Sequence, residues 1–317
     1  MIERSGENDS HEERGGWIPG APGSAAFVLS ERRPSAIPIL IAAPHGGRDY
    51  PRTLMADLRH GPATALKLED RHIDAIARRV AELTGASLLI ARAPRAMIDL
   101  NRAPDDVDWE MFVREARPRD GGGTPSRRAR SGLGLIPRRL PATGELWRRR
   151  LQADDLSARI AGVHEPYHAA LAEMLARLRD RWGAALLIDL HSMPPLPSRP
   201  GVASAQLVVG DRFGASCHGS VVAATFAHFA QVEREAAHNR PYAGGYVLER
   251  HADPRAGLHA MQIEIDRSRY LDSALVELGE GTDGIVADLS ALVRRLAALV
   301  AELGRDSGVQ DWQLAAE

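Results

Sequence analysis

Residues 38–47 read Pro-Ile-Leu-Ile-Ala-Ala-Pro-His-Gly-Gly, an apolar run that ends abruptly in a histidine and two glycines. Apolar residues at consecutive rather than alternate positions are typical of a strand buried on both faces, as in a parallel sheet. Residues 184–192, Ala-Ala-Leu-Leu-Ile-Asp-Leu-His-Ser, have the same form. Ligands bind beyond the carboxyl ends of the strands in open α/β sheets. We therefore expect His45 and His191 to face one cleft.

Strand-like and helix-like segments alternate through most of the chain. Further apolar runs occupy residues 87–91, 96–100 and 205–210, apolar and polar residues alternate over 258–265, and a short edge strand is expected at 25–30. Apolar residues recur at helical spacing over residues 68–84, 154–182, 220–232 and 284–303. This alternation predicts an α/β fold, a three-layer α/β/α sandwich around a mixed, largely parallel sheet.

A single domain is expected over residues 23–317, preceded by a tail. Residues 1–22 are acidic and lack periodicity, which predicts a disordered N-terminal tail. Residues 105–144 form an insertion rich in Gly, Arg and Pro, and a stretch this long without periodicity is either a functional lid or partly disordered. Its basic run, residues 127–130, lacks the interleaved aromatic residues that a nucleic-acid stacking platform requires. We therefore favour a solvated flexible loop and expect no nucleic-acid partner.

The composition is that of an ordinary soluble protein. The 317 residues are 44% apolar and 26% charged, with a formal net charge of −2. The single cysteine, Cys217, excludes an internal disulfide and a cysteine-based zinc site. The N-terminus has no apolar signal region and no window is apolar over the length of a membrane span. A cytoplasmic protein without a membrane partner is expected.

Residues 164–168, His-Glu-Pro-Tyr-His, match the zinc-protease pattern H-E-x-x-H. That pattern needs one uninterrupted helix, so that both histidines face the same metal. Pro166 lacks an amide proton and clashes with the preceding turn, so it belongs in the first turn of a helix. His164 would then precede the helix that carries His168, and we favour a helix start with a hydrogen-bonded histidine over a metal site.

Polar residues near other strand ends offer a second set of candidates. His45 and His191, with an acid from Glu69-Asp70, would give a two-histidine, one-carboxylate zinc site, which leaves a position open for water. Arg102 follows an apolar run and could hold a carboxylate or form a structural ion pair. Glu264 lies between two isoleucines and could be a general base or a salt-bridge partner.

These segments appear in the same order in a known family. The chain resembles the N-formylglutamate amidohydrolases, whose fold is related to that of zinc carboxypeptidases and aspartoacylases. The resemblance spans residues 38–272, and the matching segments are residues 43–47 (Ala-Pro-His-Gly-Gly), 68–74, 97–104 (Met-Ile-Asp-Leu-Asn-Arg-Ala-Pro), 189–192, 244–246 (Gly-Gly-Tyr) and 258–264. The insertion at 105–144 departs from the family pattern, which leaves the substrate open.

The resemblance implies a hydrolase that uses one zinc ion or another divalent metal. His45, His191 and Asp70, in preference to Glu69, would be the metal ligands, and Glu264 the general base. Asn101 and Arg102 would hold a substrate carboxylate, with Arg250 as a further candidate. The Gly46-Gly47 turn would let the chain approach the metal and the substrate closely.

The expected partner is a small N-acyl amino acid. The substrate implied first is N-formyl-L-glutamate, cleaved to formate and L-glutamate as in histidine degradation. Two alternatives stay open. One is a zinc deacylase or carboxypeptidase-like hydrolase of another acyl-amino acid or peptide, and the other is a non-catalytic binding protein for an acidic amino acid.

Overall fold

The computed structural model describes residues 10–118, 126–140, 143–197 and 204–314. Within these residues, eight strands form one sheet in the order β1-β2-β4-β3-β7-β10-β8-β9. The four central strands β4, β3, β7 and β10 are parallel, so their carboxyl ends meet at one edge. The strands are β1 (Ser10–Gly15), β2 (Phe27–Arg32), β3 (Ile39–Ala43), β4 (Ser87–Ala91), β7 (Ala185–Met193), β8 (Leu207–Gly210), β9 (Ala236–His238) and β10 (Leu258–Asp266).

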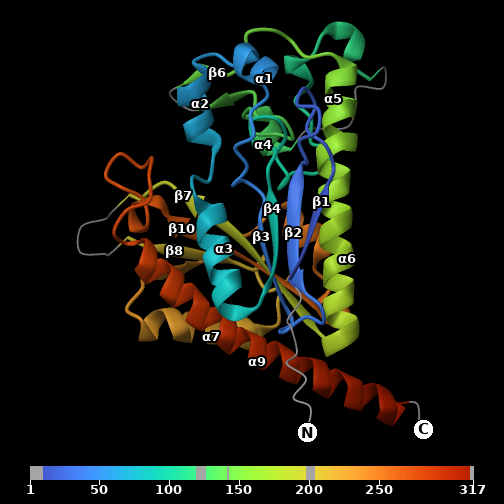
Figure 1. The fold of residues 1–317 in the computed structure, drawn as a ribbon, viewed down its shortest axis with the longest axis vertical. Coiled ribbons are helices and arrows are strands. Elements are labelled where there is room, and N and C mark those ends of the chain that lie inside the picture. Colours follow the sequence, from blue (N-terminus) through green and yellow to red (C-terminus); the bar gives the residue numbers. More distant parts are fainter. Residues whose placement is uncertain (1–9, 119–125, 141–142, 198–203, 315–317) are drawn as a thin grey trace, which may run out of the picture.

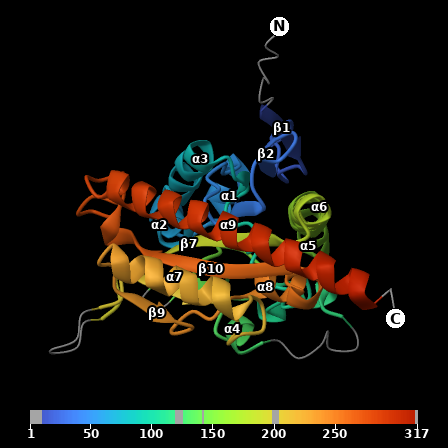
Figure 2. The ribbon, with the colours of Figure 1, turned by 90° about the horizontal axis from the view of Figure 1, so that it is seen from below.

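Helices cover both faces of this sheet (Figures 1 and 2). Alternate residues of β3 show the division, because Ile39 and Ile41 pack with one set of helices while Leu40 and Ala42 pack with the other. The first set is α3 (Ile73–Thr84), α7 (Gly219–Gln231) and α9 (Thr282–Leu314). The second set is α5 (Ala153–Arg159), α6 (Glu165–Trp182) and α8 (Tyr246–His251). The predicted three-layer α/β/α sandwich with a mixed, largely parallel sheet is confirmed.

The N-terminal segment differs from the predicted disordered tail. Residues 1–9 lie outside the described part of the chain, but Ser10–Gly15 form β1, antiparallel to β2. The side chains of β1 are exposed or nearly so, which is why no apolar pattern marked it. Its pairing comes from the backbone, which uses the open edge of β2. The strand expected at 25–30 is therefore covered by β1 and is not at the edge of the sheet.

The helix predicted over residues 68–84 begins only at residue 73, and Leu68 ends a separate helix. This separate helix, α2 (Gly61–Leu68), ends before a tight turn, and α3 begins after it at Ile73. His72 has a left-handed backbone (φ 57°), which a continuous helix does not allow. In the turn, the amide of Asp70 donates a hydrogen bond to the carbonyl oxygen of His45 (3.0 Å). The break in the helix thus brings Asp70 to the end of β3.

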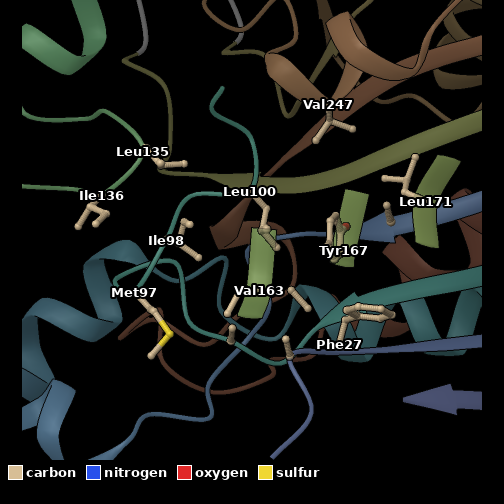
Figure 3. Close-up of a cluster of buried hydrophobic side chains, with 14 of the residues drawn as sticks. Phe27, Met97, Ile98, Leu100, Leu135, Ile136, Val163, Tyr167, Leu171 and Val247 are labelled. Atoms are coloured by element: carbon tan, nitrogen blue, oxygen red, sulfur yellow. The ribbon is translucent and has the colours of Figure 1, made fainter. Parts of the chain in front are cut away.

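The insertion at 105–144 is not a solvated flexible loop where the structure describes it. Figure 3 shows Leu135 and Ile136 beside Leu100 and Ile98, in the buried cluster that also holds Phe27. Residues 119–125 and 141–142, which include the three glycines, lie outside the described part of the chain. Other short elements are α1 (Arg52–Asp57), which precedes the insertion, and α4 (Arg127–Arg130), β5 (Arg139–Leu140) and β6 (Gly144–Glu145).

No helix among the described residues combines the length and the apolar character that crossing a bilayer would demand.

Candidate active site

Three buried side chains from separate elements converge at the carboxyl edge of the sheet. His45 follows β3, Asp70 occupies the turn between α2 and α3, and His191 lies in β7. Asp70 Oδ2 lies 3.0 Å from His191 Nδ1 and 3.5 Å from His45 Nδ1. One ligand atom from each residue lies within 4.8 Å of the others, and no second group of three such residues was found in the part of the chain that the structure describes. The cleft predicted for His45 and His191 is present, and Asp70 joins them.

A second carboxylate contacts the Nε2 atom of each histidine, on the opposite side of the ring from Asp70. Asp99 Oδ1 lies 2.7 Å from His45 Nε2, and Asp189 Oδ2 lies 2.9 Å from His191 Nε2. A carboxylate on one ring nitrogen fixes the orientation of the ring and makes the other nitrogen a better metal ligand. His45 Nδ1, the nitrogen that faces the group, is buried and has no hydrogen-bond partner among the residues that the structure describes. A buried polar atom without a partner is rare, and a metal ion on the Asp70 side would satisfy it.

The choice between Glu69 and Asp70 follows from where each carboxylate points. Glu69 Oε2 pairs with Arg71 Nη1 at 3.0 Å, away from the histidines. Asp70 faces both imidazoles; burial raises its pKa, but the two imidazoles outweigh burial and hold the pKa well below the ordinary range. Asp70 is therefore ionised, as a metal ligand must be.

Glu264 lies beside this group. In the parallel pairing of β10 with β7 it sits opposite His191. It is buried, and its Oε1 accepts a hydrogen bond from Gln262 Nε2 (2.8 Å). Burial is the largest cause that raises its pKa to about 7. A carboxyl group with a pKa near the working pH suits general acid and base catalysis.

Asn101 and Arg102 come from a turn beyond β4 and are both largely buried. Arg102 donates hydrogen bonds to the carbonyl oxygens of Asn101 (2.8 Å) and Leu133 (3.0 Å). Asn101 Oδ1 accepts from the amide of Val247 (3.0 Å), and its Nδ2 donates to Gln262 Oε1 (3.3 Å). The turn is thus fixed to the insertion, to α8 and to β10, and Figure 3 shows Leu100 and Val247 in the same apolar cluster.

These residues surround a cavity of about 180 Å³ with a strongly basic lining. Asp70 and Glu264 are its acids, and His45, His191 and Asn101 also line it. The cationic residues that line it are Lys67, Arg95, Arg102, Arg128 and Arg267. Cations outnumber carboxylates, so the cavity suits a ligand that carries more than one negative charge.

Four of these cations were missed in the sequence. Arg95 follows β4 and Arg267 follows β10, so the strand-end signal that singled out His45 could have found them. Lys67 is in the last turn of α2, where nothing in the local sequence indicates a site. Arg128 belongs to the insertion, and only the folded structure brings it to the cavity.

Two predicted features lie elsewhere. Arg250 is on α8, where Nη1 donates to the hydroxyl of Tyr246 (2.8 Å), and it does not line the cavity. The glycine turn also serves a different purpose from the one expected. A Cβ on Gly47 would collide with the backbone of Ala93, and a Cβ on Gly46 would lie 2.9 Å from that of Asp74. The two glycines allow close packing within the protein, not an approach to the substrate.

The fold and the site define an α/β protein with a candidate metal-hydrolase centre, in which a His-Asp-His group and a buried glutamate share a basic cavity. The family model of N-formylglutamate amidohydrolase matches residues 37–271. The chain therefore belongs to the N-formylglutamate amidohydrolase family, as the sequence motifs predicted.

Three similar proteins show the extent of the relationship. An N-formylglutamate deformylase from Pseudomonas aeruginosa is 31% identical over 271 residues, which cover 83% of this chain and 94% of that protein. One from Pseudomonas putida is 29% identical over 241 residues, covering 74% and 82%. The crystal structure of N-formylglutamate amidohydrolase from Ralstonia eutropha has a TM-score of 0.79 and 30% identity, covering 87% of this chain and 99% of that one.

Proposed function

We propose that this protein is a metal-dependent amidohydrolase that cleaves N-formyl-L-glutamate, with one water molecule, to formate and L-glutamate. The observation that carries the proposal is the placement of Glu264 and a His-Asp-His group in one cavity lined by cationic side chains. N-formyl-L-glutamate has two carboxylates, which match the excess of positive charge. The deformylase relatives act on this compound according to their names.

His45, Asp70 and His191 are the residues that would hold the metal, and their nitrogen and oxygen donors suit zinc. A zinc ion held by these residues would act as a Lewis acid, which would polarise the formyl carbonyl and lower the pKa of water. The protein's own part is the outer support from Asp99 and Asp189, which fixes both imidazoles.

Glu264 moves the proton in this mechanism. It accepts a proton from the attacking water and delivers it to the leaving nitrogen as the C–N bond breaks. Its pKa of about 7 allows both transfers near neutral pH. Arg102, supported by Asn101, anchors one substrate carboxylate, and the other cations of the cavity are available to the second.

The test combines metal analysis with a formate-release assay. Glu264→Gln keeps the shape and the length of the side chain but removes the carboxylate that acts as the base. We expect turnover to fall about 10²- to 10⁴-fold while the metal content stays that of the wild type. Glu31→Gln is the matched control, because Glu31 is equally buried but pairs with Arg33 and Arg177 outside the cavity.

Unchanged turnover in Glu264→Gln, or wild-type protein that takes up no divalent metal, would rule out this mechanism. A panel of N-formyl, N-acetyl and peptide substrates separates the deformylase from another deacylase or peptidase. Tight binding of L-glutamate without turnover of any acyl derivative would instead indicate a binding protein, an alternative that the presence of Glu264 beside the ligand group disfavours.

A further inference from the structure

The His-Glu-Pro-Tyr-His motif contacts the substrate-binding turn and not the metal-ligand group. His164 Nε2 lies 2.9 Å from the carbonyl oxygen of Arg102, and His168 Nε2 lies 3.0 Å from that of Leu100. Both histidines are buried. The two hydrogen bonds therefore hold the peptide carbonyls on either side of Asn101.

The carbonyl partners determine which ring nitrogens carry protons. A carbonyl oxygen only accepts, so Nε2 is the protonated nitrogen of both rings. In neutral His168, Nδ1 must then accept, and its partner at 2.9 Å, His251 Nε2, must donate. Burial lowers the pKa of His168 to about 2 and that of His251 to about 3, which keeps both rings neutral. A directed chain thus runs from His251 through His168 to Leu100.

The helix that carries His251 also contacts the side chain of Asn101. His251 ends α8, and the amide of Val247, in the first turn of α8, donates to Asn101 Oδ1. The carbonyl of Leu100 is therefore tied to α8 through the two histidines, and the side chain of Asn101 is tied to α8 directly.

The helix that carries the motif is shaped to present both histidines. Pro166 has no amide proton, and the chain before it forms a π-helical turn over Ile160–His164. The carbonyl oxygen of Gly162, four residues before Pro166, accepts instead from the amide of Trp17 (2.8 Å). The helix nevertheless continues from α5 through this turn into α6, so the prediction that Pro166 places His164 outside the helix is wrong. His164 and His168 therefore lie side by side, with ring centroids 4.4 Å apart.

We propose that His164 and His168 are positioning residues, which fix the main chain of Asn101 and Arg102 in the geometry that binds a substrate carboxylate. The proposal rests on the proposed function, because it takes Arg102 as the carboxylate anchor. It assigns the zinc-protease-like motif a role in substrate binding without contact with the metal.

The kinetic test uses His164→Leu and His168→Leu, which keep much of the volume but cannot donate. We expect KM for N-formyl-L-glutamate to rise about 10- to 100-fold with a much smaller change in kcat, because carboxylate binding serves substrate and transition state alike. His164→Gln and His168→Gln, whose amide can donate in place of Nε2, should recover a large part of the loss. Metal content should stay unchanged in all four variants.

His228→Leu is the matched control. His228 is also buried, and its Nε2 lies 2.8 Å from the backbone carbonyl oxygen of Asp288, outside the site. Its loss should lower stability in the same way but leave KM unchanged. An equal rise of KM in this variant, or a loss of metal from either motif variant, would overturn the positioning role.

Hydrogen exchange tests the proposal without any substrate. We expect the amides of residues 99–103 to exchange about tenfold faster or more in His168→Leu than in the wild type or His228→Leu, because the opening free energy of the turn falls. Unchanged exchange there would contradict the proposal. If the wild type released no formate, the proposed function would fail, yet this measurement would still decide whether the histidines order the turn.

Discussion

Asp99 and Asp189, which contact the Nε2 atoms of His45 and His191, should determine how tightly the candidate site binds a metal. Asp99 supports His45 and also accepts from the amide of Asn101 (2.9 Å), so it joins the candidate metal ligands to the turn that carries Asn101 and Arg102. Asp189 is simpler, because the bond from its Oδ2 to His191 is the one that matters for the site. Replacing it should therefore disturb metal binding alone.

Asp189→Asn should weaken metal binding about 10- to 100-fold, because the amide is a poorer acceptor and no longer raises the basicity of His191. The dissociation constant, measured by competition with a chromogenic chelator, checks this. Asp211→Asn is the control, since Asp211 is equally buried and pairs with His238 Nε2 (3.0 Å) away from the cavity. Equal affinities in wild type and Asp189→Asn would contradict the supporting role.

Arg128 is the cation that the insertion contributes to the cavity, and we expect it to bind the side-chain carboxylate of the substrate. Arg128→Gln should raise KM for N-formyl-L-glutamate about tenfold, the scale of one lost charged hydrogen bond. KM for N-formylnorleucine, which has no second carboxylate, should change little. Arg127→Gln is the neighbouring control, because Arg127 does not line this cavity and instead lines a second one, together with Asp106 and Ser126. A parallel rise for both substrates would exclude this specificity role.

At the residue scale, the sequence predicted what depends on a strand end and missed what depends on tertiary folding. His45, His191 and Glu264 each occupy a buried strand or its end, and the structure places all three in the cavity. Arg128 reaches the cavity through a segment without periodicity, so no local pattern could place it. Arg250 was carried over from the resemblance, and the structure sets it apart because α8 directs it to Tyr246.

At the element scale, the strands expected at residues 38–43, 87–91, 184–192, 205–210 and 258–265 were predicted within about two residues, because apolar residues dominate them. The apolar run at 96–100 forms turns and not a strand. The start of α3 was predicted too early, because Leu68 fits the apolar stripe of α3 yet belongs to α2. The deciding feature, the left-handed His72, is a backbone conformation that the apolar spacing does not report. The strand β1 was missed for the opposite reason, since it forms through backbone pairing without an apolar face.

The packing of α6 against α8 predicts acid sensitivity. His168 faces His164, His251 and the cationic Arg250, and burial with these neighbours lowers the pKa of His168 to about 2 and of His251 to about 3. In the unfolded chain, each histidine takes up a proton near the ordinary histidine pKa of about 6.5. In the folded protein, these two rings stay neutral at that pH. Stability is therefore complete above that pH and falls as the pH drops toward the folded values, by about 1.4 kcal/mol per pH unit for each histidine.

Urea unfolding between pH 4 and 7 measures this slope. The double variant His168→Gln, His251→Gln should be less stable at pH 7 but should lose stability less steeply below pH 6. Replacement of the exposed His11 and His60 by Gln controls for the removal of any two histidines. A slope equal to that of the wild type in the His168, His251 double variant would show that these rings do not carry the acid sensitivity.

At the scale of the whole molecule, one sheet organises the described residues, and β1 belongs to it, so the domain begins before residue 23, where the sequence predicted its start. We propose that this domain acts as one catalytic unit. The three candidate ligands come from the end of β3, from the turn before α3 and from β7, so a bound metal would link segments up to 146 residues apart in sequence, from His45 to His191. Within the described part of the chain, no group forms a hydrogen bond with His45 Nδ1, which a metal would engage. Metal binding should therefore stabilise the fold as a whole.

Removal of the metal with a chelator should lower the melting temperature by roughly 5 °C or more, because a ligand at a thousandfold excess over its dissociation constant stabilises the native state by about 4 kcal/mol. Stoichiometric Zn²⁺ should restore the original value. In His45→Ala and His191→Ala the melting temperature should respond to neither chelator nor zinc, whereas Glu264→Gln, which keeps all three ligands, should respond as the wild type does. A chelator-insensitive wild type that binds zinc would show that the metal adds no cross-link between these segments, and would separate its catalytic from its structural role.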